Sequence, residues 1–137
     1  MLSKILLAWA LMAICVIVHA AGVTSALGWV RSGAYRTDRF WRSSALFVRI
    51  AAWMILLHVV EIMVWAIAYS TQGAIGGLPA SLYFSAVTYT TTGYGDVILP
   101  EPWRLVGAIE ALTGILMCGW STGFFFAAVS RIYEARA

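Results

Sequence analysis

Residues 91–96 read Thr-Thr-Gly-Tyr-Gly-Asp, a polar and glycine-rich run between two long apolar segments. Gly93 and Gly95 flank Tyr94, and glycine adopts backbone angles that other residues resist. Successive carbonyl groups of the run are therefore able to turn toward a single axis. A Gly-Tyr-Gly turn also occurs in loops of soluble proteins, so the meaning of the run depends on its surroundings.

The composition restricts those surroundings to a membrane. Of the 137 residues, 62% are hydrophobic and only 11% are charged, which is typical of an integral membrane protein. The sequence has no acidic cluster suited to a metal and no basic run long enough for nucleic acid. We therefore expect no cofactor and no nucleic-acid partner. Cys15 and Cys118 each lie in an apolar span and are predicted to be free, buried thiols.

Three apolar segments are long enough to cross the hydrocarbon core as helices. The first occupies most of residues 1–30, and its apolar part alone reaches about 39 Å at the helical rise. The others are residues 45–69 and 103–130. The predicted fold is an all-α membrane protein with three transmembrane helices per chain.

The first span has an alternative interpretation as a secretory signal peptide. Lys4, the apolar stretch that follows it and the triplet Val18-His19-Ala20 imitate a charged start and a small-residue cleavage site. Cleavage would leave the following arginines on the outer side of the membrane. We expect the span to be retained as an extra helix.

The segment 31–44 is basic and predicts the orientation of the chain. It carries several arginines against the single acid Asp38, and such an excess marks the cytoplasmic side. Arginines recur every third residue from 36 to 42, as in a voltage-sensor helix, but polar residues interrupt the pattern. An interfacial helix on anionic membrane lipid is favoured. With the short tail 131–137 also inside, the N-terminus lies outside, in a multi-pass protein of the cell membrane.

A short helix precedes the glycine-rich run. Pro79 suits the first position of a helix over 80–90, which is too short to span and must re-enter the membrane. Such a segment is tolerated where protein buries it. The negative end of its dipole would favour cations at its carboxyl end.

With these surroundings, residues 45–130 resemble the potassium channel pore family, because the run 91–96 closely matches that family's selectivity filter. Thr92 is a departure, since an apolar β-branched residue is usual there. The resemblance implies an outer helix 45–69, a pore helix 80–90 and an inner helix 103–130. Each chain holds one filter motif, so four copies would form a homotetramer that conducts potassium passively. The implied filter residues are Thr91, Thr92, Gly93, Tyr94 and Gly95, with K⁺ on the first four.

The same resemblance assigns supporting roles. Tyr83 is expected to donate a hydrogen bond to Asp96 and thereby brace the filter. Gly114 corresponds to a gating glycine, or alternatively to a small residue for close helix packing. A helical stripe is expected to line the cavity and gate, although it could also face lipid: Ile115, Cys118, Thr122 and Phe126.

Glu61 and Glu110 are acids inside the apolar spans, where an ionised carboxylate facing lipid would be costly. Each is expected to face protein, at a similar depth behind the filter and near Thr88, Tyr89 and His58. His58 shares a helix face with Glu61. Their protonation could couple external pH to the filter, or they could form a static hydrogen-bonded pair.

Other functions remain open on the sequence. A non-selective cation channel, a potassium transporter subunit and a non-conducting accessory protein are the alternatives. A transporter usually carries four degraded copies of the motif in one long chain. No Ser/His/Asp or metal-ligand arrangement lies outside the spans, so neither an enzyme nor a small-molecule substrate is expected.

Overall fold

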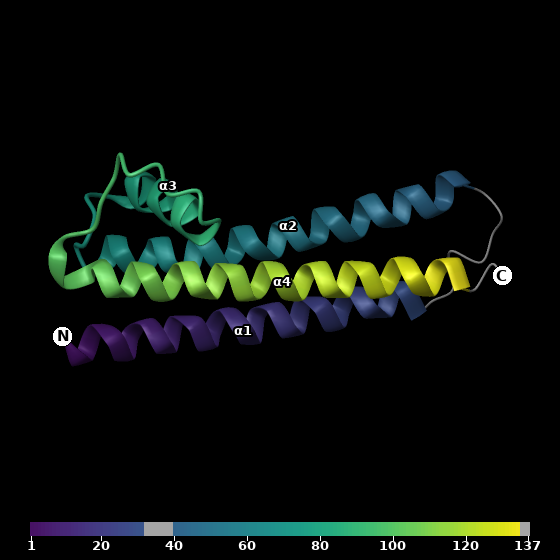
Figure 1. The fold of residues 1–137 in the computed structure, drawn as a ribbon, viewed down its shortest axis with the longest axis horizontal. Coiled ribbons are helices and arrows are strands. Elements are labelled where there is room, and N and C mark those ends of the chain that lie inside the picture. Colours follow the sequence, from purple (N-terminus) through teal and green to yellow (C-terminus); the bar gives the residue numbers. More distant parts are fainter. Residues whose placement is uncertain (32–39, 135–137) are drawn as a thin grey trace.

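The computed structural model describes residues 1–31 and 40–134, and these are almost entirely helical (Figure 1). Part of the predicted basic linker and the end of the predicted tail lie outside these residues. The elements in chain order are α1 (Leu2–Arg31), α2 (Phe40–Thr71), α3 (Leu78–Tyr89), the short 3-10 helix η1 (Glu101–Trp103) and α4 (Arg104–Glu134).

Helices α1, α2 and α4 run alongside one another as a bundle, and α3 packs against α2 at one end (Figure 1). Within the described part of the chain, these three long helices are long and apolar enough to cross a membrane. The N-terminus lies at the same end of the bundle as α3. The all-α fold with three spanning helices is therefore confirmed.

The start of α2 corrects the predicted boundary between linker and outer helix. Residues 40–44 were assigned to the basic linker or a separate interfacial helix, but they form the first turns of α2. No proline or glycine lies between residues 40 and 45 to end or redirect a helix, so the helix continues through them. Trp41 remains highly exposed at this end, as suits a side chain at a membrane interface.

The entry to α3 depends on its glycine and proline. Gly77 precedes the helix with a φ of 83°, in the left-handed region that glycine adopts readily. Pro79 follows within the first helical turn, where its missing N–H removes no helical hydrogen bond. The short helix thus begins at Leu78 and ends at Tyr89, close to the predicted range 80–90.

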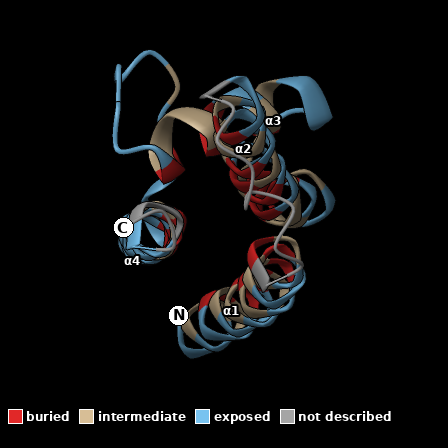
Figure 2. Ribbon diagram, turned by 90° about the vertical axis from the view of Figure 1, so that its right-hand side faces the viewer, coloured by how far each residue is buried: buried red, intermediate tan, exposed pale blue. Residues whose placement is uncertain are grey.

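The extra helix α1 packs on both α4 and α2, and the buried faces of the helices meet inside the bundle (Figure 2). Trp53 of α2 donates a hydrogen bond from Nε1 to the carbonyl oxygen of Gly22, at 2.9 Å. Its ring also packs in a T-shaped arrangement with the Trp29 ring, with the ring centroids 5.5 Å apart. Cys15 is buried as predicted, whereas Cys118 is exposed on α4 and corrects the prediction of a buried thiol.

Candidate functional site

The glycine-rich run follows α3 directly and turns back along it. Thr90 caps the helix, and the amide of Thr91 donates to the carbonyl of Thr88 at 2.9 Å. The amide of Gly93 donates to the carbonyl of Val87 at 3.0 Å. The carboxyl end of α3 therefore points at the start of the run, as the sequence predicts for a pore helix.

The sign of the backbone angle φ alternates from Thr91 to Gly95. Thr91, Gly93 and Gly95 have positive φ values of 58°, 53° and 77°, whereas the residues between them do not. Glycine supplies this conformation at little cost. Thr91 does so at a cost, because a β-branched residue rarely adopts a positive φ. The two glycines thus occupy positions that require their freedom, as their place beside Tyr94 predicts.

The whole run 91–96 is exposed in the single chain. Tyr94 retains 71% of its accessible surface. Residues 91–96 therefore form a surface available to other copies of the chain or to ions.

Tyr83 and Asp96 form the hydrogen bond expected between them. The Tyr83 hydroxyl donates to the Asp96 carboxylate at 2.7 Å and links α3 to the segment after the run. The bond favours the ionised carboxylate, so it lowers the pKa of Asp96 and raises the pKa of Tyr83. The contribution of this bond to filter function stays a prediction.

Glu110 of α4 is fully buried among polar groups from two other helices. The Tyr69 hydroxyl of α2 donates to it at 2.7 Å, and the Ser85 hydroxyl of α3 also donates to it. The carboxylate thus links α2, α3 and α4.

Glu61 is the centre of a second cluster, which we name the His19 cluster. His19 Nδ1 of α1 lies 2.9 Å from one carboxylate oxygen of Glu61, and the Tyr89 hydroxyl donates to the other. His58 Nδ1 lies 3.4 Å from the same carboxylate. The members of the cluster are His19, His58, Glu61, Tyr89 and Ser121.

The two acids therefore do not form one pair. Glu61 and Glu110 are each buried and partnered, as expected, and Tyr89 and His58 lie beside Glu61. However, each carboxylate has its own set of donors, because α3 separates its Ser85 and Tyr89 by about one helical turn.

Gly114 of α4 packs against the end of α3. A β-carbon added at Gly114 would collide with the carbonyl oxygen of Tyr89 and with its neighbouring backbone atoms. The absence of a side chain therefore lets the two helices approach at this point, whereas a hinge at Gly114 stays a prediction.

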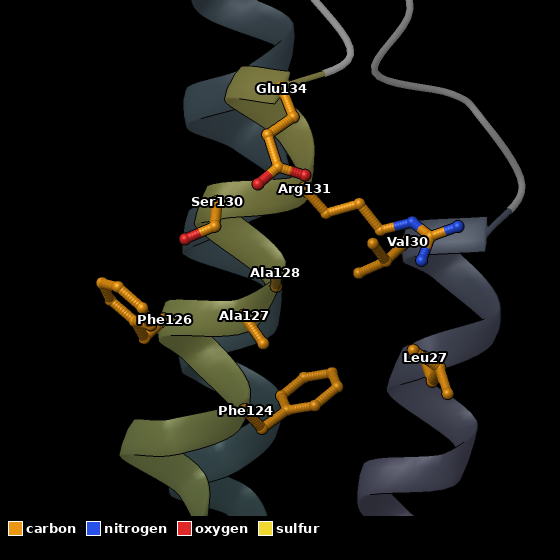
Figure 3. Close-up of a pocket in the computed structure, with 9 residues that line it drawn as sticks. All are labelled: Leu27, Val30, Phe124, Phe126, Ala127, Ala128, Ser130, Arg131 and Glu134. Atoms are coloured by element: carbon orange, nitrogen blue, oxygen red, sulfur yellow. The ribbon is translucent and has the colours of Figure 1, made fainter.

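The predicted cavity stripe lies on the outward face of α4. Ile115 and Phe126 retain 58% and 72% of their accessible surface, and Cys118 and Thr122 are also exposed. The face is thus free for either of its two predicted environments, water or lipid. A hollow of about 540 Å³ lies between the ends of α1 and α4. Its wall includes Phe126 of the stripe together with Leu27, Phe124 and Arg131 (Figure 3). It is at the opposite end of the bundle from α3.

Several members of these clusters escaped the sequence analysis. Tyr69 and Ser85 donate to Glu110, and Ser121 contacts the two histidines beside Glu61. His19 had been considered only as part of an apparent cleavage site. Polar residues in apolar spans tend to face the protein interior and pair with one another. This tendency would have marked these residues as buried and paired, but it does not predict which residue each one contacts.

Comparison with known proteins agrees with this geometry. A family model described as an ion channel matches residues 45–131. The chain belongs to this ion channel family, the potassium channel pore family. The match covers most of α2, all of α3 and most of α4, and it leaves α1 outside.

The similar curated proteins are potassium channels. The A-type voltage-gated potassium channel KCND3 of Homo sapiens is 29% identical over 90 residues, which cover 64% of this chain and 14% of the relative. The potassium voltage-gated channel protein Shal of Drosophila melanogaster is 36% identical over 59 residues, or 42% of this chain and 10% of the relative. The chain thus spans about a seventh or less of their length. No solved structure matches it.

Proposed function

We propose that this membrane protein is a potassium-selective channel that conducts K⁺ passively through a four-fold pore. The observation that carries the proposal is the alternation of φ along residues 91–96, directly after the carboxyl end of α3, in a member of the potassium channel pore family. Alternating backbone handedness allows successive peptide carbonyls to point to one side. Rings of such carbonyls replace the hydration shell of a potassium ion.

Homotetrameric assembly supplies the rings. One chain contributes one run, and that run is exposed along its whole length in the single chain. Four copies around an axis would cover this surface and place the carbonyls of residues 91–94 as ligands for K⁺. The outward stripe of α4 would then line a water-filled cavity below the filter, with Phe126 as the hydrophobic constriction.

The orientation follows from charge. Most arginines of the described residues, including Arg42, Arg49 and Arg131, lie at one end of the bundle, whereas Arg104 lies at the end that carries α3. Such an excess of basic residues favours the cytoplasmic side. The end that carries α3 and the N-terminus then faces outward. The filter therefore opens to the outside and the cavity opens toward the cytoplasm.

Rubidium uptake by proteoliposomes tests whether the purified chain conducts. Vesicles loaded with KCl should accumulate tracer Rb⁺ when they contain the wild-type chain. Gly93→Ala should abolish uptake, since Gly93 has a positive φ that alanine adopts with strain. Gly119→Ala is the matched control and should retain it. Absence of uptake by a correctly assembled wild type would favour a non-conducting accessory protein.

A further inference from the structure

We propose that the His19 cluster is a binding site for a divalent transition-metal ion, with Zn²⁺ as its natural probe. His19, His58 and Glu61 offer ligand atoms that all lie within 4.8 Å of one another. Two imidazoles and one carboxylate form an established zinc ligand set. The site joins the extra helix α1 to the pore unit, so it lies partly outside the region that the channel family shares.

The distances suit a tetrahedral ion. Zinc binds imidazole nitrogen and carboxylate oxygen at about 2.0–2.2 Å, which separates neighbouring ligand atoms by about 3.3–3.5 Å. Glu61 Oε1 lies 2.9 Å from His19 Nδ1, and its Oε2 lies 3.4 Å from His58 Nδ1. These two distances go to different oxygens of Glu61, so the His58 ring has to turn toward Oε1 for both imidazoles and one carboxylate oxygen to surround one ion. The three ligand atoms already lie within 4.8 Å of one another.

Ser121 orients both imidazoles. Its Oγ lies 3.2 Å from His19 Nε2 and 3.1 Å from His58 Nε2. When an ion occupies the two Nδ1 atoms, the ring protons lie on Nε2, and the Ser121 oxygen, which has two lone pairs, accepts from both Nε2–H groups. Both Nδ1 lone pairs then point toward Glu61, which is the arrangement a metal ion requires. Metal-bound histidines commonly donate their second ring N–H in this way.

Without a cation, the cluster lacks one donor. Two neutral imidazoles carry two protons and two lone pairs, and Ser121 has one proton to offer. The Tyr89 hydroxyl, which lies 3.4 Å from His58 Nδ1, already donates to Glu61. Among the described residues, one of the four ring nitrogens therefore has a lone pair with no hydrogen-bond donor facing it. A metal ion at the two Nδ1 atoms removes this deficit.

Burial shields most of the site from solvent. The side chains of His19 and Glu61 are fully buried, and only the His58 side chain retains 18% of its surface. His58 is therefore the entry side. The second Glu61 oxygen keeps its bond from Tyr89, so the carboxylate binds the ion with one oxygen and the pore helix with the other.

The ligands come from different helices, which explains why no spacing motif indicated a metal. His58 and Glu61 are three residues apart on α2, whereas His19 is on α1 and Ser121 is on α4. The sequence contains only two histidines, and both are in this cluster. Any protein imidazole bound to a metal on this chain must therefore come from this site.

Zinc binding to the purified, lipid-reconstituted full chain tests the proposal after chelator treatment. Titration against a chromogenic chelator should show saturation at about one Zn²⁺ per chain. His19→Gln, His58→Gln and Glu61→Gln should each weaken binding by at least about 10-fold, and Ser121→Ala by about 10-fold. Glu110→Gln and Cys118→Ser are matched controls, with a buried carboxylate and a thiol outside the cluster, and should bind as the wild type does.

X-ray absorption of the zinc-loaded wild type provides a readout that needs no variant. Two imidazole ligands per zinc would identify both histidines directly. A lack of saturable binding, fewer than two imidazoles, or full binding by an assembled His19→Gln chain would overturn the proposal. Because binding is measured without current, a failure of the channel proposal would leave this result unaffected.

Discussion

Gly114 of α4 lies against the main-chain carbonyl of Tyr89, the last residue of α3. A β-carbon at Gly114 would collide with that carbonyl oxygen. Since residues 91–96 begin two residues later, α4 contacts the backbone that positions the predicted filter. Movement of α4 at this point is thereby linked to the base of the filter.

Gly114→Ala should damage the pore through this contact. The added methyl group has to displace backbone, so we expect the free energy of unfolding to fall by about 1–3 kcal/mol and ion flux to be lost. Thermal unfolding and tracer uptake measure both effects. Gly119→Ala is the control, because its β-carbon meets no atom within 4 Å. Normal stability and flux, with altered opening alone, would indicate a hinge and contradict the packing role.

Tyr83→Phe should accelerate the loss of current during sustained opening. The substitution removes the 2.7 Å hydrogen bond to Asp96 and leaves the ring in place. Patch recordings with long depolarising or sustained activating steps measure the time course. An unchanged decay would show that the bond does not brace the filter.

The same bond predicts a pH dependence. Because Tyr83 lowers the pKa of Asp96, its stabilising effect is present above the ordinary aspartate range and is lost as pH falls through the lowered pKa. The wild type should therefore approach the behaviour of Tyr83→Phe only in strongly acidic external solution. Convergence of the two decay rates near neutral pH would contradict this account.

Glu110→Gln separates titration from scaffolding. Glutamine keeps the shape: its carbonyl oxygen accepts from one of the two hydroxyls, and its NH2 group donates to the oxygen of the other. Assembly should therefore survive, whereas Glu110→Ala should prevent it. If Glu110 couples external pH to the filter, the wild type should change its current between about pH 5 and pH 8 and the glutamine variant should not. Equal pH responses would assign Glu110 a structural role only.

Cys118 reports the environment of the inner-helix stripe. It is an exposed thiol on the face with Ile115 and Phe126, whereas Cys15 is buried. A charged thiol reagent added from the cytoplasmic side should reduce current in the wild type and in Cys15→Ser. It should have no effect on Cys118→Ser. Insensitivity of the wild type during opening would place the stripe against lipid.

Local chemistry determined which features the sequence could predict. The short helix, its proline and the Tyr83–Asp96 bond lie within about twenty residues, so the motif and the helical rise restrict their geometry. His19 meets Glu61 across 42 positions, and nothing in α1 specifies which of its faces meets α2. The predicted start of α2 at residue 45 was too late. The polar residues before it suggested that the helix begins only there, but no helix-breaking residue separates them from the helix.

Reversal potentials in planar bilayers test the central claim most directly. With KCl on one side of the purified channel and NaCl on the other, carbonyls of residues 91–95 that replace the potassium hydration shell should exclude sodium. The account predicts a reversal potential displaced strongly in the direction set by potassium, with Rb⁺ replacing K⁺ and Na⁺ carrying little current. A reversal potential near zero, with equal permeability to K⁺ and Na⁺, would contradict it and indicate a non-selective cation pore.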